Sequence, residues 1–575
     1  MTTDGEQPTL CYHFFSRNKF ADKSLFAVQS ILAQILQQRR WDTSILDVFS
    51  FASIDEADGQ LTASMLEMLI LLRVCLHHLG ETYILLDGLD ECEDPDGFLS
   101  QLLHASSGSN VRFLFFSRPT VQFLLQNVPQ SNCVNMDKEF VGPDIRRFLN
   151  RRLQRMADEG LFAPHKDGSL FVEQLLNGSD GMFLWAKLML NYLQSPALTP
   201  HERLETIQTV TRPERLDEMY QRIISALQSS SISVRKLATR IFSWLLYCRS
   251  ELTVNELHEA VTSNGSSSVS SKYPNFDHTL VLTCHGLVAL SPTRVCQFVH
   301  LSIRDFLRDC GKSWGATGDP THLTTGTPLI PVEFDGHMEI LRCCIDYMTF
   351  QDLVQPVLAA LPRTSSRDSV AEIVAGRLSL IRYCSLNWTH HLSSITEMLQ
   401  ELSNNKTRRI REVVSVISRL VASQPSLTSW LELLYLFGLE APPVAKLREW
   451  SAYVSRTCSG IEHHDLEEHA QMISELAADL ESIHNVWGQI LPKKPHLVWG
   501  DLTAYTPSKF LWRTNEAHLS TLRPEKPQRA STAAAPLKTI SRVSLDGTKV
   551  GVLSIWPSRY VQVDVVPNIS TYRVS

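Results

Sequence analysis

The 575-residue chain lacks features that would place it in several large classes of protein. Its 12 cysteines are scattered and include no C-x-x-C pair, so we expect the reduced thiols of an intracellular protein. No apolar run is long enough to cross a bilayer, and residues 1–8 are polar where a secretory signal would be apolar. The net charge of −7 creates no field that attracts nucleic acid. We therefore expect a cytoplasmic protein with no membrane or nucleic-acid partner.

Glycine is absent between Gly5 and Gly59. A loop of the form G-x-x-x-x-G-K-[ST] cradles phosphates in many nucleotide triphosphatases, because its glycines let backbone N–H groups approach the ligand. No such loop precedes residue 87. The G-K-S tripeptide at 311–313 does not supply one, because Phe306 stands at the upstream glycine position and the segment follows a predicted helix.

An apolar run over residues 83–86 ends in a group of acids. These acids are Asp87, Asp90 and Glu91. The pattern predicts a buried parallel strand, and such strands carry ligand chemistry at their carboxyl ends. A second apolar run, 111–116, is followed by Arg118. Acids in this position hold Mg²⁺ and polarise water in nucleotide triphosphatases, and a nearby cation can sense a phosphate.

Four short motifs follow one another in an order and spacing that resemble the NACHT branch of the STAND signalling NTPases. Within that branch, the chain is similar to the fungal Nod-like-receptor type with a nephrocystin-3-like nucleotide domain. The resemblance covers roughly residues 10–310. Its motifs are D-G-L-D-E at 87–91, F-S-R-P at 116–119, G-M-F-L-W-A at 181–186 and F-V-H-L-S at 298–302.

The resemblance implies roles for the same residues. Asp87 would order Mg²⁺ through its water shell, and Asp90 or Glu91 would orient or deprotonate the attacking water. Arg118 would face the γ-phosphate, a task that suits a permanently charged planar group. His300 would contact the β-phosphate of ADP and hold the protein closed until ATP replaces ADP. The alternative for His300 is a hydrogen-bonded histidine at a strand-to-helix junction.

The chain departs from the family pattern at two points. Phe183 stands where the family has a proline that packs on adenine, and we expect it to pack in the core against Trp185. The family's sheet has the order five-one-four-three-two, and this chain starts at what resembles strand two. The strand that carries the phosphate loop is therefore missing. The remaining strands would form a four-stranded sheet if the fifth strand pairs directly with the fourth. Otherwise the fifth strand is not part of the sheet.

Without a phosphate cradle, Mg²⁺ would lose the nucleotide oxygens that normally complete its shell. We therefore expect an N-terminally truncated or degenerate NACHT/STAND protein that binds ATP or ADP weakly or not at all and does not turn ATP over. Two alternatives stay open. One is an active ATP or GTP hydrolase of the same family, and the other is a nucleotide-independent scaffold built on the helical region.

The predicted fold class is α/β, a partial parallel sheet of the P-loop NTPase kind, followed by a helical domain, a winged helix, an α-helical region and a short β tail. Strands are expected at 10–16, 83–87, 111–116 and around 133–136, and Pro143 is expected to start a helix. The predicted segments are a nucleotide domain at 1–160, a helical domain at 161–231, a winged helix at 232–310, a linker at 311–335, a helical region at 336–523, a linker at 524–537 and a β tail at 538–575.

The helical region is the expected surface for protein partners, and the parent switch would form homo-oligomers. A seven-residue repeat of apolar side chains is formed by Leu466, Ile473, Leu480 and Trp487. We expect these side chains to pack inside a helical array and not to form a coiled coil. Residues 463–469 contain three histidines, but their spacing predicts a solvated helix start and no metal site. The β tail resembles the opening strands of a WD-repeat blade.

Overall fold

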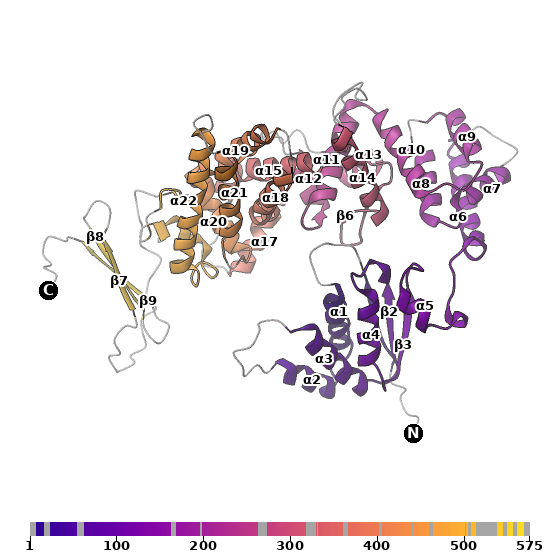
Figure 1. Ribbon diagram of the computed structural model, residues 1–575, viewed down its shortest axis with the longest axis horizontal. Helices are drawn as coiled ribbons and strands as arrows, with labels where there is room; N and C mark the ends of the chain where they lie inside the picture. The colour runs from indigo at the N-terminus through magenta and orange to yellow at the C-terminus, as the bar shows by residue number, and fades with distance from the viewer. Residues whose placement is uncertain are drawn as a thin grey trace. The chain divides into compact units, whose positions relative to one another are not determined.

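The computed structural model divides into two compact units, Met1–Val141 and Gly142–Ser575. Helices make up most of it, with three small sheets (Figure 1). The structure describes residues 7–15, 23–53, 63–162, 168–195, 198–262, 273–317, 329–330, 332–359, 366–401, 405–439, 441–458, 464–500, 502–503, 506, 508–512, 538–543, 549–555 and 561–567.

A parallel sheet of three strands forms the centre of the first unit. Strands β1 (Thr9–Phe14), β2 (Thr82–Asp87) and β3 (Val111–Phe116) lie in the order β1-β2-β3. Their registers align the last residues of the strands, Phe14, Asp87 and Phe116. Helices α1 (Lys23–Gln38), α3 (Met65–His78) and α4 (Pro95–Ala105) pack their apolar sides against the sheet (Figure 1). The carboxyl ends of the strands therefore meet at one edge, where the predicted acids lie.

The two faces of this sheet differ in exposure. On one face, Cys11, Ile84 and Leu86 are fully buried under the helices. The opposite face exposes about half or more of several large apolar side chains, which are Leu10, Tyr12, Phe14, Leu114 and Phe116. Parallel sheets are ordinarily covered by helices on both faces, so the exposed face departs from the usual arrangement.

The outer edge of β1 is closed by two glutamines of α1. The Gln34 amide donates to the Tyr12 carbonyl at 2.7 Å and accepts from the Tyr12 N–H at 3.0 Å. Gln38 makes the same pair of bonds with Leu10, at 2.7 and 3.1 Å. Each amide thus replaces the backbone of a neighbouring strand.

The outer edge of β3 has no such cover in the part of the chain that the structure describes. Thr82 N donates to the Asn110 carbonyl and Gly88 N to the Phe116 carbonyl. In this hydrogen-bonding pattern every second residue of β3 bonds β2, so the backbone N–H and C=O groups of Phe113 and Phe115 point away from β2. No hydrogen bond to those outward groups is found among the described residues.

The three strands at 10–16, 83–87 and 111–116 are confirmed, but the connections after β3 differ from the prediction. Residues 133–137 have no regular structure, so the predicted fifth strand is absent there. Helix α6 (Lys138–Asp158) contains Pro143 in its interior. It begins earlier than predicted because Asp137 accepts a hydrogen bond from the Phe140 N–H at 3.0 Å, as an N-cap does. Two short helices of the first unit are α2 (Thr43–Ser53), which was not predicted, and α5 (Gln122–Asn127).

Four helices open the second unit after α6. They are α7 (Gly168–Ser179), α8 (Phe183–Leu193), α9 (Pro200–Thr209) and α10 (Leu216–Gln228). Helix α9 was not predicted. Its Arg203 is buried and donates to the carbonyls of Leu193 and Ser195 at 2.7 and 2.8 Å, which ties α9 to the end of α8.

A small antiparallel sheet with surrounding helices follows, as a winged helix requires. The helices are α11 (Ile232–Tyr247), α12 (Val254–Thr262), α13 (Phe276–Thr283) and α14 (Leu301–Thr317), and strands β4 (Leu252–Thr253), β5 (Val288–Leu290) and β6 (Val295–Phe298) lie in the order β4-β6-β5. Helix α14 runs through residues 311–317, where the linker was expected to begin. The predicted linker at 524–537 lies outside the described residues.

Eight helices build the region from residue 333 to 487 (Figure 1). They are α15 (Glu333–Thr349), α16 (Gln351–Ala359), α17 (Arg367–Arg377), α18 (Ile381–Glu401), α19 (Lys406–Val421), α20 (Gln424–Leu436), α21 (Val444–Thr457) and α22 (His464–Trp487). The heptad residues of α22 are all buried, and α22 packs on α21. The expectation of internal packing is therefore confirmed.

The winged helix is bonded to this helical region at several points. The Arg249 N–H donates to the Tyr383 hydroxyl at 3.0 Å, and the Leu380 N–H donates to Glu259 Oε2 at 3.3 Å. The Tyr347 hydroxyl also donates to Glu259. Because these bonds join α12 and the end of α11 to α15 and α18, the two regions form one packed body.

The last described strands form an antiparallel meander. It consists of β7 (Lys538–Val543), β8 (Lys549–Ile555) and β9 (Val561–Pro567), in the order β7-β8-β9. Across the described ranges, no helix combines the length and apolar character needed to span a bilayer.

Candidate functional site

The carboxyl end of β2 is shaped by a glycine in a left-handed conformation. Gly88 has φ of 72°, and an added Cβ would lie 3.2 Å from the Phe15 carbonyl oxygen. A glycine therefore lets the chain turn sharply after the strand. The Asp87 side chain before it is exposed. The Glu91 carboxyl carbon comes within 3.9 Å of the same Cβ position, so this carboxylate lies close to the turn at Gly88.

Asp90 is bonded to Arg118 at the end of β3. Asp90 Oδ1 accepts a hydrogen bond from the Arg118 backbone N–H at 3.1 Å, and its Oδ2 lies 3.4 Å from Arg118 Nε. The Asp90 side chain is 13% exposed, whereas that of Arg118 is 63% exposed. Asp90 thus holds both the backbone and the side chain of Arg118 while the guanidinium stays open to solvent.

These acids do not form a metal site by themselves. Within the described ranges, no group of three or more histidine, cysteine or acidic side chains is placed to hold a metal ion. Mg²⁺ prefers octahedral oxygen ligands and often takes several of them from nucleotide phosphates. The residues present therefore fit Mg²⁺ only together with a nucleotide, and the sequence supplies no glycine-rich cradle for its phosphates.

His300 belongs to the second unit and lies between β6 and α14. Its Nδ1 lies 2.7 Å from Ser302 Oγ and accepts from the Ser302 backbone N–H at 3.2 Å. Ser302 Oγ in turn lies 2.7 Å from the Tyr220 hydroxyl on α10. Ser302 closes the F-V-H-L-S motif but was given no role from the sequence, and Tyr220 lies in no motif, because the bond between them is set by folding.

Phe183 does not pack in the core, which corrects the expectation. Its side chain is 42% exposed, and its ring centroid lies 5.9 Å from that of Phe148 on α6. Trp185 is fully buried and packs on Gly178, where an added Cβ would lie 2.8 Å from the indole ring. Because Gly178 has no side chain, there is room for the Trp185 ring in the core. Phe183, at the start of α8, remains at the surface.

Two of the three histidines near the start of α22, His464 and His469, are described by the structure, and their surroundings differ. His464 is exposed and lies 3.2 Å from Glu468, as a solvated helix start predicts. His469 differs from the prediction, because it is only 3% exposed. It accepts a hydrogen bond from Trp450 Nε1 and contacts Ser418 Oγ, and burial lowers its pKa to about 4.

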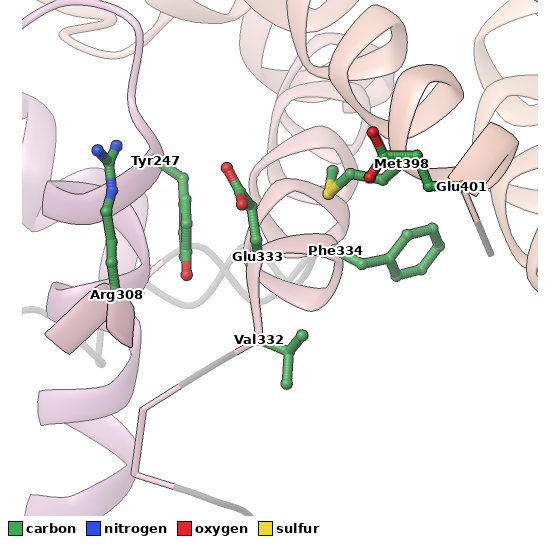
Figure 2. Close-up of a pocket in the computed structure, with 7 residues that line it drawn as sticks. All are labelled: Tyr247, Arg308, Val332, Glu333, Phe334, Met398 and Glu401. Atoms are coloured by element: carbon green, nitrogen blue, oxygen red, sulfur yellow. The ribbon is translucent and has the colours of Figure 1, made fainter. Parts of the chain in front are cut away.

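A cavity of about 260 Å³ lies between the winged helix and the helical region. Figure 2 shows Tyr247 and Arg308 on one side and Phe334, Met398 and Glu401 on the other. Arg308 donates to the Leu246 carbonyl at 3.1 Å near the end of α11, where a cation is favourable. The walls are mostly apolar, and the charges of Arg308 and the two glutamates Glu333 and Glu401 are mixed in sign.

Comparison with known proteins adds to this geometry. Residues 2–118 match the family described as Nephrocystin 3, N-terminal, and residues 225–314 match the winged helix domain of GPI inositol-deacylase. The vegetative incompatibility protein HET-E-1 of Podospora anserina is 21% identical over 389 residues, which are 66% of this chain and 27% of that protein. The chain therefore spans about a quarter of the length of this relative.

One solved structure is also similar in part. It is the STAND protein with a tetratricopeptide repeat sensor, PH0952, from Pyrococcus horikoshii, at 11% identity and a TM-score of 0.26 over 86% of this chain and 77% of that one. A likeness at that level does not bear on the arrangement of this chain.

The nephrocystin match over the acid-bearing sheet, the winged-helix match and the curated relative support a NACHT/STAND protein similar to the Nod-like-receptor type. More narrowly, residues 2–118 are similar to the nephrocystin 3 N-terminal family, in a sequence that contains no G-x-x-x-x-G-K-[ST] pattern.

Proposed function

We propose that this chain acts as a regulatory switch and interaction scaffold in which nucleotide binding is impaired. The observation that carries the proposal is the arrangement of residues at the carboxyl end of the parallel sheet. Asp90 and Arg118 are held in place there beside Asp87, while the 575 residues contain no G-x-x-x-x-G-K-[ST] loop. The groups that would respond to a triphosphate are thus retained without the backbone pocket that would bind it.

Each site residue has a distinct part in this proposal. Asp87 would order Mg²⁺ through water when a nucleotide is bound, since its carboxylate is exposed at the strand end. Glu91 is the better candidate to orient water, because Asp90 already bonds Arg118. Arg118 would approach a phosphate with its exposed guanidinium. His300 would contact ADP from the winged helix.

A thermal-shift measurement with Mg·ATP tests the impaired binding. If the dissociation constant is about 5 mM or weaker, then 5 mM ATP stabilises the protein by no more than about 0.4 kcal/mol. We expect no resolvable rise in melting temperature. A rise of several degrees that disappears in the Asp87→Ala variant would overturn the proposal, and ATP turnover lost in Asp87→Ala and Glu91→Ala would favour the hydrolase instead.

A second candidate is a scaffold whose partner binding does not depend on nucleotide. The hydrogen bonds between the winged helix and the helical region favour it. Tyr383, Tyr347 and Glu259 join the two regions into one body that would present its surface in any nucleotide state. The test is a protein partner recovered with the full chain. Equal recovery with Mg·ATP, with Mg·ADP and without nucleotide supports the scaffold. Recovery that depends on nucleotide supports the switch.

A further inference from the structure

The outer edge of β3 carries backbone groups that no described residue bonds. The N–H and C=O groups of Phe113 and Phe115 point away from β2, and no hydrogen bond to them is found in the described part of the chain. At the opposite edge of the sheet, side-chain amides of α1 bond the corresponding groups of β1. A strand edge without such cover is a template for pairing with another strand. The sheet can therefore be extended at β3.

The single charged side chain of β3 does not protect this edge. Natural sheets often place a charge on an edge strand, where it disfavours the approach of another strand. Arg112 instead lies over β2, with its guanidinium 3.2 Å from Glu81 Oε1 and 5.8 Å from the centre of the Tyr83 ring. Within the first unit, the edge is therefore accessible to a strand that approaches in the plane of the sheet.

The free backbone groups of β3 select one register for pairing with a second copy of the chain. A twofold axis perpendicular to the sheet would place two β3 strands antiparallel, edge to edge. Val111 does not fit such a pair, because its N–H already donates to the Ser109 carbonyl at 3.0 Å. All the free groups are used when Phe113 of one copy lies opposite Phe115 of the other, since each such pair exchanges both of its N–H···O bonds. Leu114 then lies opposite Leu114 of the other copy.

The side chains on the uncovered face of the sheet fit this register. Leu114 would meet its own copy in a non-hydrogen-bonded pair, in which side chains lie closest together. Phe116 of one copy would lie opposite Arg112 of the other, where the ring can pack along the aliphatic part of the arginine side chain. The guanidinium can stay on Glu81 meanwhile. No like charges face each other across the axis, so the edge is complementary to itself.

We propose that the outer edge of β3 is a homodimer interface, at which two copies of this chain join their sheets through antiparallel pairing of residues 112–116. The pairing requires no nucleotide, so it goes beyond the proposed function and does not rest on it. A single pair of short strands is a small interface compared with the roughly 1,200 Å² that stable complexes bury, and we therefore expect a dissociation constant of about 10–500 µM.

Sedimentation of the full chain without nucleotide, at concentrations of about 5–500 µM, measures this dissociation constant. Leu114→Lys places like charges opposite each other and should weaken the dimer about tenfold or more. Leu10→Lys is the matched control, because Leu10 and Leu114 are each 50% exposed and Leu10 lies on the covered strand β1. We expect the control to dimerise as the native chain does.

Two outcomes of this measurement would overturn the proposal. A native chain that stays monomeric over the whole range would leave the edge to a strand of a different protein. Equal dissociation constants for Leu114→Lys and Leu10→Lys would place any dimer contact elsewhere. Loss of folding is separated from loss of pairing by mixing Leu114→Lys with Leu114→Asp. The mixture should associate more tightly than either variant alone, because opposite charges then meet at the axis.

Cross-linking tests the register. In a Cys133→Ser background, which removes an exposed thiol, Leu114→Cys should form a disulfide between copies on oxidation. Opposite residues of a non-hydrogen-bonded pair are about 4.5 Å apart at Cα, within the range of a disulfide. Phe116→Cys in the same background is the control, because it would lie opposite Arg112 and away from its own copy. Equal yields from the two variants, or no disulfide in Leu114→Cys, would refute the antiparallel pairing centred on Leu114.

Discussion

The buried His469 provides a quantitative test of the packing of the helical region. It joins α22 to α21 and α19, since Trp450 Nε1 donates to its Nε2 at 3.4 Å and its Nδ1 lies 3.2 Å from Ser418 Oγ. An indole nitrogen can only donate, so Nε2 must be unprotonated and Nδ1 carries the proton. Protonation of Nε2 would break the bond to Trp450 and place a charge in the core.

The sign and size of the pH effect follow from the pKa. Burial lowers the pKa of His469 from 6.5 to about 4 in the folded protein. The unfolded chain therefore binds more protons between these values, and stability falls as the pH falls below about 6.5. The free energy of unfolding should decrease by up to about 1.4 kcal/mol per pH unit, or by about 1.6 kcal/mol between pH 6.5 and 5, because half of the unfolded histidine is still neutral at pH 6.5.

Hydrogen exchange of the α22 amides, corrected for the intrinsic pH dependence of exchange, measures this free energy locally. The His469→Gln variant is the control, because its amide can still accept from Trp450 and does not titrate. We expect the native chain to lose about 1.6 kcal/mol more protection than His469→Gln over this interval. Equal losses in the two proteins would show that His469 is not the buried neutral group described here.

Three further predictions concern the candidate site in the first unit and, in the second unit, the contact between the winged helix and the helical region. Gly88→Ala should destabilise the first unit by about 1–2 kcal/mol in chemical denaturation because of its left-handed backbone, and Gly88→Asn should cost less, so equal effects would contradict the conformational explanation. Asp90→Asn keeps an acceptor for the Arg118 N–H and should lower the free energy of unfolding by less than about 1 kcal/mol, whereas Asp90→Ala should lower it further. A loss in Asp90→Asn above about 1 kcal/mol would mean that the ion pair with Arg118 supplies most of the stabilisation. Tyr383→Phe removes the hydroxyl that accepts from the Arg249 N–H and lies 2.8 Å from His391 Nε2. It should lower the melting temperature by the effect of about 1–3 kcal/mol, and an unchanged value would show that water replaces the hydroxyl.

The parts of the fold that the sequence predicts are those that local pattern decides. The runs at 83–86 and 111–116 are apolar enough to be central strands, and the seven-residue spacing from Leu466 to Trp487 requires a buried helix face. The failures have long-range causes. Cys133 and Val134 suit a strand, yet no neighbouring edge binds them, and α6 starts early because of one side-chain bond from Asp137.

The sequence indicates which residues the candidate site contains, but not which hydrogen bonds join them. The order of Asp87, Asp90 and Arg118 along the chain indicates the edge of the sheet where they lie. The pairing of Asp90 with Arg118 depends on the turn at Gly88, and the bond from Tyr220 to Ser302 depends on how α10 packs on α14. Each joins residues far apart in sequence, so no short motif contains them.

The unequal edges of the first sheet limit how copies of this chain can associate through their backbones. Gln34 and Gln38 occupy the outer side of β1, while the outward groups of Phe113 and Phe115 on β3 have no bonding partner among the described residues. A protein with a single reactive edge can join one other copy and then stops, whereas one with two can grow into a filament. Among the described residues, this sheet could therefore pair with another copy only at β3, which would limit such pairing to two copies.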